Sequence, residues 1–186
     1  MALVILAHSD YSKSVANKAI IEYLKLNCED LEIRNLIELY PSYKIDVDDE
    51  QEALLRHQQI IFQYPLYWYN MPAILKQYFD SVLTHGFAYG KDTHLLEGKL
   101  FIPSITIGAP KEDYRANGDA HFRVNEFCKN LEQTAYYTKM IYIDPLYFHG
   151  TSPVLFTQQE IEQKAKIYAK DLAAFIQKLQ NQDQIE

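Results

Sequence analysis

The chain has 186 residues, which is enough for one domain with a sizeable hydrophobic core. Its net charge of −7 at pH 7 argues against nucleic acid or an anionic membrane surface as the main partner. The two cysteines, Cys28 and Cys128, match no metal-ligand spacing, so we expect reduced thiols in a cytoplasmic protein. The N-terminal segment does not resemble a signal peptide, and no apolar run approaches the ~18 residues of a membrane span.

Segments with strand and helix patterns alternate along the chain. The expected strands are residues 2–7, 31–36, 60–63, 100–107, with an interruption at Pro103, and 140–148. Helical spacing predicts helices over residues 14–26, 46–57, 73–83, 122–137 and 158–179. This alternation predicts an α/β three-layer sandwich whose five-stranded parallel sheet has the order 2-1-3-4-5. We expect residues 1–180 to form a single domain and residues 181–186 to form a frayed C-terminal tail.

The first loop of interest, residues 7–20, leads from the first buried strand into a helix that starts near Ser14. A helix start presents unpaired N–H groups and the positive end of the helix dipole, and both attract a phosphate. His8, Ser14 and Asn17 can add side-chain donors. The segment has no Walker pattern and no G-x-G-x-x-G. The alternative is that Ser14 only caps the helix.

The second loop of interest follows the third strand and contains the sequence P-L-Y-W-Y-N-M-P, from Pro65 to Pro72. Prolines restrict the backbone, and aromatic side chains offer wide faces to a flat ligand. In α/β proteins, loops at the carboxyl ends of parallel strands form the rim of the binding cleft. The alternative is a corner of helix packing in which the aromatic side chains are buried.

Together, A-H-x-x-x-x-x-S-x-x-N at residues 7–17 and the aromatic loop resemble the signature of the flavodoxin-like NAD(P)H:quinone oxidoreductases of the DT-diaphorase type. Within that family, the chain resembles the bacterial ancillary quinone reductases of glutathione-gated potassium efflux systems. The resemblance covers nearly the whole chain and implies a flavodoxin-like fold. It implies an NAD(P)H dehydrogenase that binds FMN, with FAD as the open alternative. The implied reaction is a two-electron, ping-pong hydride transfer from NAD(P)H through the flavin to a quinone.

The resemblance also assigns roles to residues. It places the flavin phosphate at His8 and at residues 14–17, and the isoalloxazine ring along residues 66–69. Tyr114, in a third loop after the fourth strand, would border the hydride-transfer pocket as the catalytic residue. The expected cofactor-binding residues are His8, Ser14, Val15, Ala16, Asn17, Leu66, Tyr67, Trp68, Tyr69, Thr106, Ile107, Gly108, Ala109 and Tyr114.

The third loop, residues 105–122, departs from the family pattern. Ile107 stands where a threonine is usual, and Ala109 stands where the second glycine is usual. The histidine that follows Gly118 comes one residue late, at His121, so its role is left open. These departures concern substrate choice and rate more than flavin binding.

Two other protein classes are also compatible with the sequence. The resemblance also allows a regulatory ancillary subunit of a membrane potassium efflux transporter, at the inner face of the cell membrane, with reductase activity secondary. A one-electron flavodoxin is the other alternative, but the loops at residues 85–99 and 108–121 are long enough to form a nicotinamide pocket. We expect no metal site. Which quinone is reduced, and whether NADH or NADPH is preferred, stay open.

We also expect a homodimer with the flavin near the subunit boundary. Aromatic residues gather at the rim loops, and aromatic patches that a monomer leaves uncovered tend to be interfaces. The expected contact is the helix at residues 73–83 with the loop at residues 85–90, including Phe87. The alternative is that these aromatic residues all lie in the core or face the flavin.

Overall fold

The computed structural model describes residues 1–91 and 94–182 and has a parallel β-sheet at its centre. The strands are β1 (Ala2–Leu6), β2 (Leu31–Asn35), β3 (Gln59–Pro65), β4 (Leu100–Ile107), β5 (Ile141–Tyr142) and β6 (Leu146–His149). Their order is β2-β1-β3-β4-β5, and β6 also pairs with β4. The predicted order 2-1-3-4-5 is therefore confirmed.

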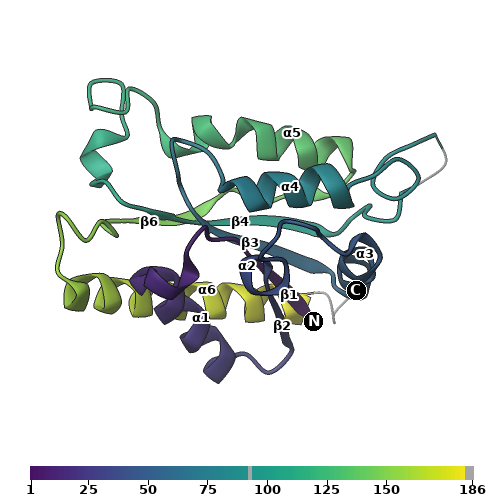
Figure 1. The fold of residues 1–186 in the computed structure, drawn as a ribbon, viewed down its shortest axis with the longest axis horizontal. Helices are drawn as coiled ribbons and strands as arrows, with labels where there is room; N and C mark the ends of the chain where they lie inside the picture. Colours follow the sequence, from purple (N-terminus) through teal and green to yellow (C-terminus); the bar gives the residue numbers. More distant parts are fainter. Residues whose placement is uncertain (92–93, 183–186) are drawn as a thin grey trace.

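Helices cover both faces of the sheet and make three layers (Figure 1). One face carries α1 (Val15–Asn27) and α6 (Gln158–Gln182), which pack against each other. The other face carries α3 (Val47–Arg56), α4 (Ala73–Val82) and α5 (Lys129–Tyr137). A short helix, α2 (Leu36–Leu39), follows β2 directly and is not predicted by the sequence pattern.

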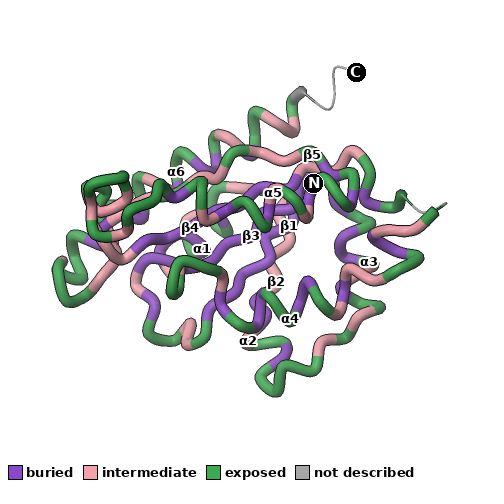
Figure 2. The backbone as a smooth tube through the Cα atoms, turned by 90° about the horizontal axis from the view of Figure 1, so that it is seen from above, coloured by how far each residue is buried: buried purple, intermediate pink, exposed green. Residues whose placement is uncertain are grey.

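The strand β1 shows why its sequence is apolar throughout. Side chains of a strand alternate between the two faces of the sheet. Leu3 and Ile5 lie in the hydrophobic cluster under α3, α4 and α5, whereas Val4 and Leu6 lie in the cluster under α1 and α6. Both faces are covered, so every position of the strand is buried, as the central strands in Figure 2 show.

Pro103 lies inside a continuous β4, and the neighbouring strand is broken opposite it, where that strand has a proline of its own, Pro145. Phe101, two residues earlier, accepts a hydrogen bond from Ile143 N–H (3.0 Å), and alternate residues of a strand point the same way. Pro103 therefore has no N–H to offer on that side. The outer strand is broken opposite this point, because β5 pairs with β4 up to Phe101 and β6 pairs from Ser104 onwards. The strand predicted over residues 140–148 is thus two short strands.

Two other predicted boundaries differ from the structure. The helix predicted over residues 122–137 begins as a 3₁₀ helix, η3 (Val124–Cys128), and becomes α-helical only from Lys129. The last helix, predicted to end at residue 179, continues to Gln182 as α6, and residues 183–186 of the expected tail lie outside the described residues. In the loop at residues 85–99, residues 92–93 also lie outside them.

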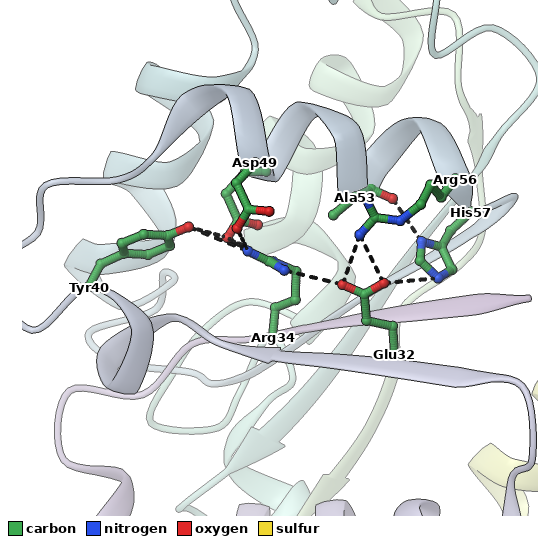
Figure 3. A network of polar contacts seen from close by, with 8 residues as sticks. Glu32, Arg34, Tyr40, Asp49, Ala53, Arg56 and His57 are labelled. Atoms are coloured by element: carbon green, nitrogen blue, oxygen red, sulfur yellow. Dashed lines mark hydrogen bonds and ion pairs between the residues drawn. The ribbon is translucent and has the colours of Figure 1, made fainter.

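An ion-pair network joins β2 to α3 at the edge of the sheet (Figure 3). Arg34 Nε donates to Glu50 Oε1 (2.8 Å), and Tyr40 Oη donates to the same oxygen (2.7 Å). Glu32 accepts from Arg56 on α3 (3.2 Å) and from Arg34 (3.2 Å). Burial raises the pKa of the Glu50 carboxyl, while Tyr40 and Arg34 oppose that shift. The network fixes α3 on the edge strand and uses two of the chain's four arginines.

Two further findings bear on the expectations above. Cys28 and Cys128 are free cysteines, and burial raises the pKa of the Cys128 thiol to about 12. Among residues 1–91 and 94–182, no helix has the length and apolar character needed to cross a membrane.

Candidate functional site

A pocket of about 470 Å³ opens at the carboxyl ends of β1, β3 and β4. This is where the sheet order changes direction, and α/β proteins bind their ligands at such points. Nine of the predicted cofactor-binding residues line it: His8, Ser14, Val15, Ala16, Asn17, Leu66, Tyr67, Thr106 and Gly108. The structure therefore brings three separate loops together, as the sequence pattern predicts.

The start of α1 supplies free backbone donors to this pocket. Ser14 is the N-cap residue, and its hydroxyl oxygen accepts a hydrogen bond from Asn17 N–H (3.2 Å). The N–H groups of Val15 and Ala16 find no acceptor among the described residues. They belong to the first turn, where a helix has no partners of its own for such groups. Two backbone donors and the positive end of the helix dipole thus face the pocket.

A buried chain of hydrogen bonds holds Asn17 in place. Its Nδ2 group donates both to Ser14 Oγ (3.1 Å) and to Thr106 Oγ1 (3.1 Å), while its Oδ1 accepts from Gln63 Nε2 (2.8 Å). The side chain is only 1% exposed. Both amide hydrogens are in use, so Asn17 has no side-chain donor left for a phosphate. It positions the groups around it.

The same chain of hydrogen bonds continues across the sheet to the last helix. Gln63 Oε1 accepts from Ser104 Oγ (2.5 Å), and Ser104 Oγ pairs with the Tyr168 hydroxyl of α6 (2.7 Å). All of these polar groups are therefore satisfied inside the core, which a buried polar side chain requires. A consequence is that α6 supports the first loop through Ser104 and Gln63, although it lies far along the chain.

Three hydroxyl groups in the pocket share one arrangement. Ser14 and Thr106 each accept a hydrogen bond from the Asn17 amide, and Tyr67 Oη lies 3.1 Å from His8 Nε2. A hydroxyl that accepts a bond still has its own hydrogen to donate. Each of the three can therefore donate to a ligand in the pocket.

The protonation of His8 supports this assignment for Tyr67. His8 Nδ1 accepts a hydrogen bond from Asp10 N–H (3.0 Å), so the neutral ring carries its hydrogen on Nε2. That hydrogen is then donated to the Tyr67 hydroxyl. Burial lowers the pKa of His8, and the nearby Asp10 only partly opposes this shift. His8 is therefore neutral at pH 7 and orients the tyrosine.

The second loop is a two-residue hairpin turn. Tyr67 and Asn70 exchange two backbone hydrogen bonds, both of 2.9 Å, around Trp68 and Tyr69. These two central residues have φ of +48° and +62°, the left-handed conformation that a type I′ turn requires. Such a conformation costs an aromatic residue about 1–3 kcal/mol and is found mainly at functional sites. The strain supports a binding role for this turn.

The backbone groups of the second loop are not equally available. Leu66 N–H donates to Thr106 O (2.8 Å), and Tyr67 N–H donates to Asn70 O. The N–H groups of Trp68 and Tyr69 have no acceptor among the described residues. The turn therefore offers two adjacent backbone donors of the kind that the carbonyl and ring-nitrogen edge of a flavin can accept.

Five predicted residues do not line this pocket. Trp68 is 93% exposed, and Tyr69 stacks on Phe127 with ring centroids 5.0 Å apart. Ile107 is buried in the core, so its side chain contributes nothing to the site. Its C=O accepts a hydrogen bond from Thr151 N–H. Ala109 and Tyr114 lie beside His149 at a neighbouring cavity.

The third loop is held by a close turn at Gly118. A Cβ at this position would lie 2.3 Å from Asp113 O and 2.6 Å from Glu112 O, so only glycine fits. His121 follows with φ of +59°, and its side chain is exposed. His121 lines neither this pocket nor the cavity beside Tyr114.

The sequence pattern missed one loop of the site. Residues 151–153, after β6, line the pocket, and Thr151 N–H and Ser152 N–H bond to the carbonyls of Ile107 and Gly108 (3.1 and 3.3 Å). The signal was present, because a loop that follows a strand of a parallel sheet ends at the same edge as the other loops. Asp10 and Lys13, which form an exposed ion pair of 2.6 Å, also line the pocket.

Comparison with known proteins places the chain in a family. The family described as "Flavodoxin-like fold" matches residues 1–172. The chain is 40% identical over 149 residues to the uncharacterized NAD(P)H oxidoreductase YrkL of Bacillus subtilis, covering 80% of this chain and 85% of the relative. It is 37% identical over 157 residues to the glutathione-regulated potassium-efflux system ancillary protein KefF of an Enterobacter species, covering 81% and 84%. The chain belongs to this flavodoxin-like family.

Solved structures agree with that assignment. The general stress protein 14 of Treponema denticola in complex with FMN superposes with a TM-score of 0.84 at 36% identity, covering 93% of this chain and 98% of the other. An NADPH-quinone reductase from P. pentosaceus superposes with a TM-score of 0.77 at 30% identity, covering 91% and 97%.

Proposed function

We propose that this chain is a flavin-dependent NAD(P)H:quinone oxidoreductase that uses FMN. The observation that carries the proposal is the pocket at the carboxyl ends of β1, β3 and β4. It combines two free backbone donors of α1 with three hydroxyl groups that are free to donate. The similarity to an FMN complex and to an NADPH-quinone reductase supports it.

The residues of the pocket fit a flavin monophosphate. The amides of Val15 and Ala16 and the hydroxyl of Ser14 would hold the phosphate, because a helix start favours a doubly charged anion. Among the residues that the structure describes, one carboxylate lines the pocket, that of Asp10, and it is paired with Lys13. The turn beside the pocket would hold the pyrimidine edge of the flavin ring through the free backbone donors of Trp68 and Tyr69.

FMN, when bound, supplies the two-electron chemistry between NAD(P)H and a quinone. The two substrates bind in turn, so we expect ping-pong kinetics. The protein's part is to bind and orient. His8 keeps the Tyr67 hydroxyl directed, Asn17 keeps Ser14 and Thr106 directed, and the strained turn fixes the backbone beside the ring. Tyr114, half-buried beside His149, is the residue we assign to the substrate side of the site.

The proposal is tested with purified protein and added FMN. We expect flavin fluorescence to be quenched to a stoichiometric end point and NAD(P)H to be oxidised with simple quinones, giving parallel double-reciprocal lines. Chromatography of the released flavin separates FMN from FAD. A protein that quenches neither flavin, or that binds FMN but turns over no quinone in a broad panel, would contradict the assignment.

A second candidate function is an ancillary subunit of a membrane potassium efflux transporter. It is favoured by the 37% identity to a relative that carries this name. We expect membranes from cells that express such a transporter to retain the purified chain, and membranes without the transporter to release it. Equal retention by both membranes would count against this role.

A homodimer is part of the proposed function, and the supporting surface lies between α4 and α5. A mostly apolar groove of about 440 Å³ runs there, lined among others by Met71, Phe79, Leu83, Tyr89 and Tyr137. The predicted contact at Phe87 needs correction, because this side chain is only 5% exposed and packs in the core. We therefore place the contact on the α4–α5 groove and not on Phe87.

A further inference from the structure

A second cavity, of about 610 Å³, lies beneath the third loop, between that loop and the edge strand β6. The side chains that matter here are Lys111, Tyr114, Arg115, Arg123, Tyr147 and His149. The cavity has aromatic faces and an excess of cations, and apart from Tyr114 the flavin site proposed above does not use these side chains.

The two arginines of this cavity are uncommitted. Arg34 and Arg56, the other arginines of the chain, belong to the network between β2 and α3. Within residues 1–91 and 94–182, the guanidinium groups of Arg115 and Arg123 form no ion pair and no side-chain hydrogen bond. Both are exposed at the cavity. Guanidinium groups with free donors are suited to phosphate, which they can bind through two parallel hydrogen bonds.

The cavity remains cationic when its acidic residues are included. Glu112 and Asp144 also line it, against Lys111, Arg115 and Arg123, which leaves one positive charge in excess. The chain as a whole carries −7. A local excess of positive charge on an acidic protein draws an anionic ligand to that place.

Aromatic side chains and one directed acceptor complete the cavity. The ring of His149 lies between Tyr114 and Tyr147, with centroids 5.2 and 5.6 Å away. His149 Nδ1 donates to Ala109 O (3.1 Å), so Nε2 of the neutral ring is an acceptor. Stacking faces, an acceptor for an amino or hydroxyl group, and guanidinium donors for phosphate together match a phosphorylated nucleoside.

The cavity shares two loops with the flavin pocket. The loop after β4 contributes Gly108 to the pocket and Lys111 to the cavity. The end of β6 and the loop after it contribute His149 to the cavity and Thr151 to the pocket. A ligand with two linked parts, such as a dinucleotide, can therefore occupy the cavity with one part and the flavin pocket with the other.

We propose that this cavity binds the phosphorylated adenosine end of the nicotinamide cosubstrate, and that Arg115 and Arg123 make the enzyme prefer NADPH to NADH. The inference rests on the proposed function. The 2′-phosphate is the only group that distinguishes the two cosubstrates, and paired guanidinium groups are the chemistry that recognises it.

Steady-state kinetics of Arg115→Gln, Arg123→Gln and the double variant test the preference. We expect each single change to lower kcat/KM for NADPH roughly tenfold or more, since a charge-assisted bond is lost. The value for NADH, the KM of the quinone and the affinity for FMN should stay the same. Lys25→Gln, an equal charge change on an exposed lysine of α1, is the control. Equal effects of the arginine variants on NADH and NADPH would overturn the proposal.

Calorimetry with adenosine 2′,5′-bisphosphate provides a readout that does not depend on activity. We expect the FMN-loaded protein to bind this compound more tightly than 5′-AMP, and the double variant to bind both equally weakly. Unchanged bisphosphate affinity in the double variant would refute the assignment of this cavity as the adenosine site. If the bisphosphate binds through the two arginines but no quinone is reduced, the adenosine site is supported and the proposed reaction is contradicted. If quinone reduction uses NADH and NADPH equally, the proposed reaction is supported and the proposed role of the cavity is contradicted.

Discussion

At the scale of single residues, Ser14 has two roles that can be separated. It caps α1 through its oxygen, and its own hydrogen is free to be donated to a ligand in the pocket. We expect Ser14→Ala to weaken FMN binding by about 1.5–3 kcal/mol, the value of a hydrogen bond to a charged group. The loss of the cap should cost only about 1 kcal/mol of folding stability.

Fluorescence titration of FMN and urea unfolding measure these two effects. Ser12→Ala is the matched control, because the Ser12 hydroxyl is exposed and, among the described residues, bonds only to Asp10 in the same loop. An unchanged FMN affinity in Ser14→Ala, with the fold intact, would leave Ser14 as a capping residue alone.

Asn17 should behave in the opposite way. Its side chain is bonded on all sides, so Asn17→Ala leaves Gln63 Nε2 without a partner in the core. We expect a loss of unfolding free energy of about 1–3 kcal/mol, the cost of a buried group that loses its hydrogen bond. Urea unfolding of the FMN-free protein measures it. A variant as stable as the wild type would show that the buried chain of hydrogen bonds contributes nothing to stability.

His8 leads to a prediction about pH. Burial lowers its folded-state pKa below the ordinary value of 6.5. When pH falls through about 6.5, the unfolded chain takes up a proton that the folded chain does not, so stability falls. We expect the unfolding free energy to decline less in His8→Gln than in the wild type below that pH. Identical pH profiles in FMN-free protein would mean that the pKa of His8 is the same in the folded and the unfolded chain.

The roles of single residues were harder to predict from the sequence than their place in the site. The loop pattern predicted His8, Ser14 and Asn17 at one pocket, and the structure brings them together. It could not show that Asn17 is fully bonded, because its partner Gln63 is 46 residues away along the chain. Likewise, the pattern could not show that Thr106 lines the pocket while Ile107 packs in the core, because successive side chains of β4 point to opposite faces of the sheet.

At the scale of elements, the strongest sequence signals were confirmed and the errors have local causes. The apolar runs of β1 and β3 predicted buried central strands, because both faces of the sheet are covered. The segment 140–148 did carry a local signal for the break between β5 and β6, because Asp144 and Pro145 lie in it and proline interrupts a strand. The 3₁₀ start before α5 has helical spacing too, so periodicity does not separate the two.

The third loop provides a prediction at this scale. Gly118→Ala would place a Cβ 2.3 Å from Asp113 O. We expect a loss of stability of about 1–3 kcal/mol, as for other overpacked sites, and a lower turnover because Tyr114 shifts. Gly108→Ala is the steric control for stability alone, because its Cβ would meet only Ser152 Cβ at 3.7 Å but the residue lines the flavin pocket. Thermal unfolding and kcat check the two effects, and equal stability of both variants would contradict the argument.

At the scale of the whole molecule, the α4–α5 groove is the surface to test for dimerisation. We expect the wild type to sediment at about twice its mass of 21.8 kDa. Tyr137 is 64% exposed on this groove, so Tyr137→Lys should shift the protein towards monomer. Leu26→Lys, on α1 at the opposite face of the sheet, is the control. A wild type that is monomeric at micromolar concentration and fully active would exclude the dimer.

The exposed turn after β3 has a practical consequence. Trp68 is the single tryptophan of the chain, and it stands in water on a backbone that two hydrogen bonds hold rigid. Its emission is therefore a site-specific optical reporter that requires no label. FMN bound beside it would quench that emission by energy transfer, and a protein partner covering it would shift the emission to the blue. The intensity and wavelength of the tryptophan emission can thus distinguish cofactor loading from partner docking in the unmodified protein.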